Sequence, residues 1–148
     1  MSAPKLEPGQ SLADCPATKE FRERHEQVAR AAEEHAAQRQ HAKGKGTARE
    51  RIEQLLDNGS FLEVGQFSGS GVGANAKPSG VVTGFGTIDG RQVAVYSQDF
   101  SVQGGSLGSV EGDKIVRLLD DALRLRIPII GLIDSGGAKI QEGVGALR

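Results

Sequence analysis

The chain of 148 residues contains no tryptophan and a single cysteine, Cys15. A lone cysteine excludes an internal disulfide and any metal site built from several cysteines. The formal net charge is only −1, so no overall field favours nucleic acid or an anionic membrane surface. No apolar run approaches the ~20 residues that a membrane-spanning helix needs. The N-terminus lacks the basic and then apolar pattern of a secretory signal, so we expect a cytoplasmic protein.

Proline and then charged residues dominate the first third of the chain. Residues 1–17 are rich in proline and predict a flexible arm. Residues 18–43 are rich in alanine, glutamate and arginine and predict a helix with a thin apolar stripe. Thr47 and Glu50 have the spacing of a capping box, which opens a second helix that Asn58-Gly59 would close. We therefore expect N-terminal helices within residues 18–57.

The rest of the chain favours an α/β fold. Residues 81–88 and 92–97 look like strands and flank Asp89-Gly90, a dipeptide typical of a type I′ hairpin. Residues 65–79 are rich in glycine and serine and predict a loop, and apolar residues recur at helical spacing over residues 107–125. After Pro128, the apolar run 129–133 predicts a strand buried on both faces, as in a parallel sheet.

Glycines follow this strand directly, in the segment Asp134–Gly143 with the sequence DSGGAKIQEG. A glycine pair lets the backbone turn tightly and brings bare amide groups close to a ligand. A helix that began there would add its free amides and the positive end of its dipole. The segment therefore predicts a backbone site for an anion or a developing oxyanion, the alternative being a turn that only joins strand to helix.

Two serines raise the hypothesis of a hydrolase. Ser106 lies in a segment, GGSLG, that fits a nucleophile elbow, and Ser135 lies in a segment similar to that around the reactive serine of proteases. Both need a histidine, and all three histidines precede either serine: His25, His35 and His41. A nucleophile elbow needs its histidine after the serine, so this order excludes the elbow. The chain order of histidine, aspartate and serine found in some proteases remains an open alternative. The histidines also lack the i,i+4 spacing of a zinc pair, and we expect no metal.

The sequence resembles one family at five separate motifs. Residues 134–143 closely resemble the DSGGARIQEG segment of biotin-dependent acyl-CoA carboxyltransferases, the β subunits of propionyl-CoA and related acyl-CoA carboxylases. Four more segments match motifs of that family in the family's order: GKxTARERI at 44–52, GVVTGxG at 80–86, SQDF at 97–100 and GGSLG at 104–108. The chain is therefore identified as similar to this family over most of its length.

The resemblance implies a crotonase-like α/β spiral fold, with residues 18–148 as the start of a truncated N-terminal carboxyltransferase domain that includes the helices of 18–57. It implies transfer of a carboxyl group from carboxybiotin, held on a separate carrier protein, to the α-carbon of propionyl-CoA or acetyl-CoA. Expected partners are biotin carboxyl carrier and biotin carboxylase subunits, and a homohexamer of the full-length protein. A biotin-dependent acyl-CoA decarboxylase subunit and a non-catalytic fragment are the alternatives, and we expect the 148 residues alone to be inactive.

The resemblance also implies site residues. Backbone amides of the glycine segment would form an oxyanion hole for the enolate that arises when an acyl-CoA loses its α-proton. The candidate amides are those of Gly137, Ala138 and Gly143, with Gly136 against the coenzyme A. Basic residues near the start of the second helix would bind the phosphates of coenzyme A, unless they form an ordinary charged surface: Lys43, Lys45, Arg49 and Arg51.

Overall fold

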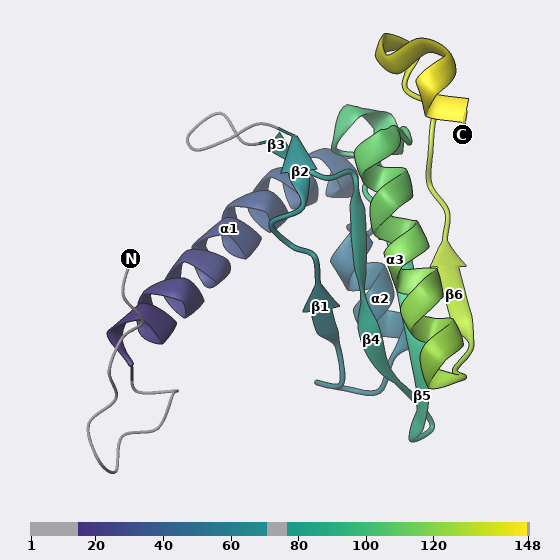
Figure 1. Ribbon diagram of the computed structural model, residues 1–148. Helices are drawn as coiled ribbons and strands as arrows, with labels where there is room; N and C mark the ends of the chain where they lie inside the picture. The colour runs from purple at the N-terminus through teal and green to yellow at the C-terminus, as the bar shows by residue number, and fades with distance from the viewer. Residues whose placement is uncertain (1–14, 71–76, 148) are drawn as a thin grey trace.

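A four-stranded mixed sheet with one helix on each face forms the centre of the molecule, as the computed structural model shows (Figure 1). The structure describes residues 15–70 and 77–147. The strands lie in the order β1-β4-β5-β6, with neighbours antiparallel except for the parallel pair β5 and β6. They are β1 (Leu62–Val64), β4 (Val81–Ile88), β5 (Arg91–Gln98) and β6 (Ile129–Leu132).

The hairpin of β4 and β5 confirms the predicted type I′ turn. Asp89 and Gly90 both have positive φ, of 50° and 73°, which matches the twist of the two strands. The Asp57 carboxylate accepts hydrogen bonds from the N–H groups of both turn residues, at 3.0 and 2.9 Å, and from the Thr87 hydroxyl at 2.5 Å. These bonds lower the pKa of Asp57. The hairpin is the longest paired part of the sheet.

Helix α2 (Ala48–Leu55) covers one face of the sheet. The predicted capping box is present, because Thr47 Oγ1 accepts from the Glu50 N–H at 3.1 Å and Glu50 accepts from the Thr47 N–H at 2.8 Å. Ile52 is fully buried in a core that α2 forms with the facing strand residues: Val82, Val93 and Val95. The helix ends before the predicted Asn58-Gly59 stop, since Leu56 already has an extended conformation.

Helix α3 (Ser109–Leu125) covers the other face and returns the chain to β6. It begins two residues after the predicted start at 107. Leu118 and Ala122 are buried against Ala94 of β5, and Ile129 of β6 packs at the edge of the same cluster. Because the chain crosses from β5 through α3 into a parallel neighbour, β5 and β6 end at the same edge of the sheet. That edge carries the glycine segments.

Helix α1 (Pro16–His41) extends away from the sheet at its N-terminal end, as Figure 1 shows. It begins inside the predicted arm of residues 1–17, since proline is well tolerated in the first turn of a helix. Residues 1–14 of that arm lie outside the described residues. Ala36 and Gln40, near the other end of the helix, are completely buried. The last turns of α1 therefore pack into the domain, and Phe21, near its other end, contacts Phe67.

Three sequence-based expectations about secondary structure were wrong. Strand β6 is half-buried rather than buried on both faces, because β5 is its one neighbour within the described residues. Short strands lie where no strand was predicted: β1, and the pair β2 (Gly69–Ser70) and β3 (Lys77–Pro78). The segment after the glycine turn is the 3-10 segment η4 (Ile140–Leu147), interrupted at Gly143, rather than an α-helix. Among the described residues, no helix is long and apolar enough to cross a membrane.

Candidate functional site

Two glycine segments, one after β5 and one after β6, lie against each other and form the candidate site. The Gly136 N–H donates to the Gly104 carbonyl at 2.8 Å. Leu107 then donates to the Gly137 carbonyl at 3.0 Å and accepts from the Lys139 N–H at 2.8 Å, as in a parallel bridge opposite Ala138. The sequence GGSLG thus supports the turn DSGGAK.

Gly105 shows why this contact requires glycine. Its φ is +63°, and a Cβ atom at this position would lie 2.2 Å from the Asp134 carbonyl oxygen. Ser135 reinforces the contact, because its hydroxyl donates to the Gly105 carbonyl at 2.8 Å. The two segments therefore approach each other backbone to backbone, with no room for a side chain between them.

The bridge determines where the amides of the turn point. Gly136 donates to Gly104, and the Gly137 N–H donates to the Ser135 hydroxyl at 3.0 Å, so both amides have partners inside the turn. Ala138 lies between two residues that bond to Leu107, so its own N–H and carbonyl point to the opposite side. Within the described part of the chain no acceptor contacts the Ala138 N–H, and the residue is exposed.

The other predicted donor, Gly143, lies in a different setting. It falls inside the 3-10 segment η4 with φ of 56° and ψ of −136°, which breaks that segment. The expected α-helix is therefore absent here, and a 3-10 segment interrupted at Gly143 takes its place. Gly143 stays a predicted donor, and within the turn itself Ala138 is the amide that points outward.

Lysines from the connection between α1 and α2 lie beside the turn. Lys45 Nζ is 3.1 Å from Asp134 Oδ1, in an ion pair at the first residue of the turn. The ammonium groups of Lys43 and Lys45 lie 4.9 and 5.5 Å from the centre of the Phe100 ring, in cation–π contact. The Lys45 side chain is 53% exposed, so its charge is open to solvent and to ligands.

The two predicted arginines have protein partners instead. Arg49 donates to both oxygens of Glu63, at 3.0 and 2.9 Å, and to Glu33 of α1 at 3.2 Å. Burial lowers the pKa of Arg49, but these two carboxylates outweigh it and raise the pKa above the usual value. Arg51 donates to the backbone carbonyls of Gln98 and Thr47. These contacts join α1, α2 and the sheet.

A buried acid that sequence reasoning missed also lies at this edge of the sheet. Glu111, in the first turn of α3, is 2% exposed, and its carboxylate lies 2.7 Å from Lys139 Nζ. The available signal was its place three residues after Gly108, which is the capping-box position of a helix that begins at Ser109. The apolar spacing predicts a start at residue 107, which places Glu111 outside the capping position.

The serine and histidine contacts give no support to a hydrolase. The Ser106 hydroxyl donates to the Gln103 carbonyl at 2.8 Å, and Ser135 bonds within the glycine segments. His41 pairs with Glu50 at 2.9 Å at the end of α1, and His35 is exposed on the same helix. Within residues 15–70 and 77–147, no group of histidine, cysteine or acidic side chains has the arrangement of a metal site.

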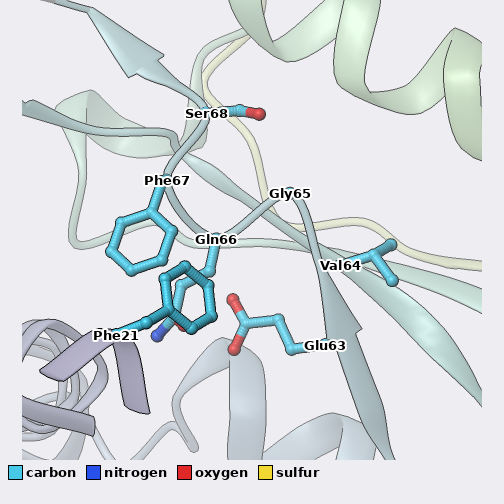
Figure 2. A pocket seen from close by; sticks show the side chains of 7 residues that line it. All are labelled: Phe21, Glu63, Val64, Gly65, Gln66, Phe67 and Ser68. Carbon is cyan, nitrogen blue, oxygen red and sulfur yellow. The ribbon is translucent and has the colours of Figure 1, made fainter. Parts of the chain in front are cut away.

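A separate hollow of about 520 Å³ lies between α1 and the segment that follows β1. Figure 2 shows the rings of Phe21 and Phe67 side by side at one wall, with centroids 5.7 Å apart, and Val64 pointing away from them. Glu63 lines the hollow and also binds Arg49. The hollow is therefore bounded by the contacts that dock α1, and none of the predicted site residues lines it.

The family model described as the carboxyl transferase domain matches residues 39–148. The chain belongs to this family. The matched residues include both glycine segments, the lysines beside them and the whole of the sheet. The motifs GGSLG and DSGGAK, which identify the family in the sequence, are the two segments that form the backbone contact described above.

Individual relatives are identical to this chain at about half of the aligned residues. The propionyl-CoA carboxylase beta chain of Saccharopolyspora erythraea is 54% identical over 133 residues, which cover 86% of this chain and 24% of the relative. The methylmalonyl-CoA decarboxylase subunit alpha of Veillonella parvula is 49% identical over 120 residues, which cover 77% of this chain and 24% of that subunit. The chain thus spans about a quarter of the length of these relatives.

Solved structures confirm the predicted crotonase-like α/β fold. A transcarboxylase 12S structure, described as a hexamer assembly with hydrolysed methylmalonyl-coenzyme A bound, superposes with a TM-score of 0.78 at 38% identity. The match covers 96% of this chain and 29% of that one. The beta subunit of geranyl-CoA carboxylase from P. aeruginosa gives a TM-score of 0.71 at 27% identity, over 93% of this chain and 28% of that subunit.

Proposed function

We propose that this chain is part of a carboxyltransferase subunit that moves a carboxyl group from carboxybiotin to the α-carbon of a short-chain acyl-CoA. The observation that carries the proposal is the outward-pointing Ala138 amide, on a turn supported by the GGSLG segment, in a member of the carboxyl transferase family. The similarity to a propionyl-CoA carboxylase beta chain favours propionyl-CoA or acetyl-CoA as the acceptor. Biotin, on its carrier protein, supplies the carboxyl group when it is bound.

The chemistry explains why a backbone amide suits this step. As the N–C bond of carboxybiotin breaks, the biotin nitrogen would take the α-proton, and the thioester would become an enolate with a negatively charged oxygen. The α-carbon would then form its new bond to the released carboxyl carbon. A fixed N–H group that points at this oxygen stabilises the charge and needs no reorganisation during the reaction. Ala138 provides such a group on the exposed side of the turn. Other donors of the oxyanion hole would come from parts of the relatives that this chain does not span.

The lysines beside the turn suit the phosphates of coenzyme A. Lys43 and Lys45 have open ammonium groups above Phe100, and Lys45 is paired with Asp134 at the beginning of the turn. We assign the phosphate contacts to these two lysines, because Arg49 and Arg51 are held by protein acceptors. We also propose that Gly136 contacts coenzyme A. Its N–H is bonded to Gly104, so the contact would be made by its Cα.

The assembly is proposed from the relatives. Residues 18–148 would form the beginning of the first carboxyltransferase domain, with α1 and α2 as its N-terminal helices. The partners would be a biotin carboxyl carrier protein and a biotin carboxylase subunit, and the full-length protein would form a homohexamer in the cytoplasm. The similar transcarboxylase 12S structure is described as a hexamer assembly.

An assay of transfer in both directions tests this function. A full-length subunit that carries this sequence would be mixed with carboxylated biotin carrier and propionyl-CoA, and methylmalonyl-CoA would be measured. We expect transfer from carboxybiotin, and no transfer by the 148-residue chain alone. Release of carbon dioxide from methylmalonyl-CoA without the forward reaction would favour the decarboxylase, which the similarity to the Veillonella parvula subunit keeps as a second candidate. No reaction in either direction would refute the proposal.

A further inference from the structure

We propose that Glu111 and Lys139 form a latch that positions the Ala138 amide for catalysis, so that both are positioning residues of the carboxyl transfer reaction. This inference rests on the proposed function of the turn. It assigns a task to a buried acid and a largely buried lysine, neither of which is among the predicted oxyanion donors or coenzyme A contacts. The latch joins the first turn of α3 to the segment that follows β6.

The Glu111 carboxylate joins three separate parts of the chain. One oxygen accepts from the Gly80 N–H at 3.2 Å, just before β4. The other accepts from the Gly108 N–H at 3.0 Å, in the GGSLG segment, and lies 2.7 Å from Lys139 Nζ. A buried carboxylate is costly unless donors surround it, and this one has three. Gly80 and Gly108 are themselves buried, so the contact is closed to water.

The Glu111 carboxylate keeps its negative charge although it is buried. Burial by itself raises the pKa of Glu111, but the bonds from Lys139, Gly80 and Gly108 outweigh burial and hold the pKa below its usual value. The carboxylate is therefore ionised at neutral pH and attracts the Lys139 ammonium. The Lys139 side chain is only 13% exposed, so solvent screens this pair little.

Lys139 is held at both its backbone and its side chain, and Ala138 directly precedes it. The Lys139 N–H bonds to Leu107 at 2.8 Å, while its ammonium group bonds to Glu111 on α3. Glu142 strengthens the same junction, because it accepts from the Ser109 N–H at 2.7 Å at the start of α3. The peptide plane between Gly137 and Ala138 is set by the Leu107 N–H, which donates to the Gly137 carbonyl at 3.0 Å, and the anchored Lys139 holds the next peptide of the same bridge. Loss of the side-chain anchor loosens this end of the bridge and lets the Ala138 peptide shift.

The test uses a full-length carboxyltransferase subunit that carries this sequence, with Lys139→Met and Glu111→Gln as the disrupting variants. Lys139→Arg keeps the charge and is the conservative variant. Asp121→Asn is the matched control, because it breaks an exposed ion pair with Arg124 near the C-terminal end of the same helix, whereas Glu111 lies in its first turn. Two measurements are made on each variant: carboxyl transfer kinetics, and hydrogen–deuterium exchange of residues 104–108 and 135–139.

We expect Lys139→Met and Glu111→Gln to lower kcat by about 100-fold, the scale for a catalytic group displaced by about 1 Å, while the KM for acyl-CoA changes far less. Exchange should become faster in both glycine segments. Lys139→Arg should recover most of the activity, and Asp121→Asn should behave like the wild type.

Unchanged exchange in Lys139→Met would overturn the latch, whatever the activity. Faster exchange with an unchanged kcat would overturn its role in positioning. Faster exchange in a protein whose wild type transfers no carboxyl group would refute the proposed function and leave the latch as a structural contact.

Discussion

A single methyl group added at Gly137 should impair catalysis while the protein still folds. Its φ is +113°, a conformation that residues with a side chain rarely adopt, and a Cβ atom there would meet no other atom within 4 Å. Gly137→Ala therefore creates backbone strain and no steric overlap. Strain of this kind costs about 1–3 kcal/mol, which is modest beside the stability of a folded domain. The variant should fold, with a slightly lower free energy of unfolding.

The backbone relieves this strain by rotating at residue 137, which turns the Ala138 N–H away from the substrate. Loss of one oxyanion donor costs about 2.7–4 kcal/mol in the transition state, or about 10²–10³-fold in kcat. Binding of acyl-CoA should weaken much less, because the amide acts mainly on the enolate. Transfer kinetics of a full-length subunit that carries this sequence would measure both parameters, with circular dichroism as the check on folding.

Gly136→Ala provides the matched control. The φ of Gly136 lies outside the left-handed region, and a Cβ atom there would be 3.5 Å from the Gly104 carbonyl oxygen, which is ordinary van der Waals contact. Its N–H would remain bonded to that carbonyl. We expect this neighbouring variant to retain most of its kcat, and any loss to appear in the KM for acyl-CoA, because Gly136 is proposed to contact coenzyme A through its Cα. A folded Gly137→Ala variant with wild-type kcat, or two variants that lose kcat equally, would refute the argument from backbone direction.

Arg49→Met should lower the free energy of unfolding by about 3 kcal/mol, because it leaves the half-buried Glu63 without its cation; a urea titration that shows less than about 1 kcal/mol would contradict this. Burial lowers the pKa of Lys114 to about 8 from 10.5, so the unfolded chain binds more protons between these values and this lysine makes stability rise with pH across that window. Lys114→Met should remove that part of the rise in urea titrations, and an identical pH dependence in both proteins would speak against it. Ser106→Ala should keep most of the transfer activity, since its hydroxyl bonds only to a backbone carbonyl; a folded but inactive variant would reopen the serine-nucleophile hypothesis.

Local signals in the sequence predicted the elements that local chemistry determines. The Thr47 and Glu50 capping box, the Asp89-Gly90 turn and the apolar spacing of α3 each act within a few residues, and the structure confirms all three. The pairing of β1 with β4 was missed because β1 has only three residues and its partner lies about twenty positions later. A pattern so short has no readable periodicity.

The location of the site stays a prediction from the sequence, and the geometry within it could not be read from the sequence. Glycine composition and family resemblance pointed to the turn after β6, whereas the direction of each amide depends on the bridge between Leu107 and Ala138, which joins residues 31 positions apart. The partners of Arg49 come from α1 and β1, so no spacing near Arg49 signals that it is occupied. The role of Glu111 likewise depends on three chain segments that meet only in the folded domain.

The most direct test of the account is a structure of a full-length subunit that carries this sequence, with a non-reactive acyl-CoA analogue bound. The account predicts that the thioester oxygen lies about 2.7–3.1 Å from the Ala138 nitrogen, the distance expected for an oxyanion donor. It also predicts that the coenzyme A phosphates lie near Lys43 and Lys45. A bound analogue whose thioester oxygen is held elsewhere, with the Ala138 N–H directed at water or at another part of the protein, would contradict the central claim.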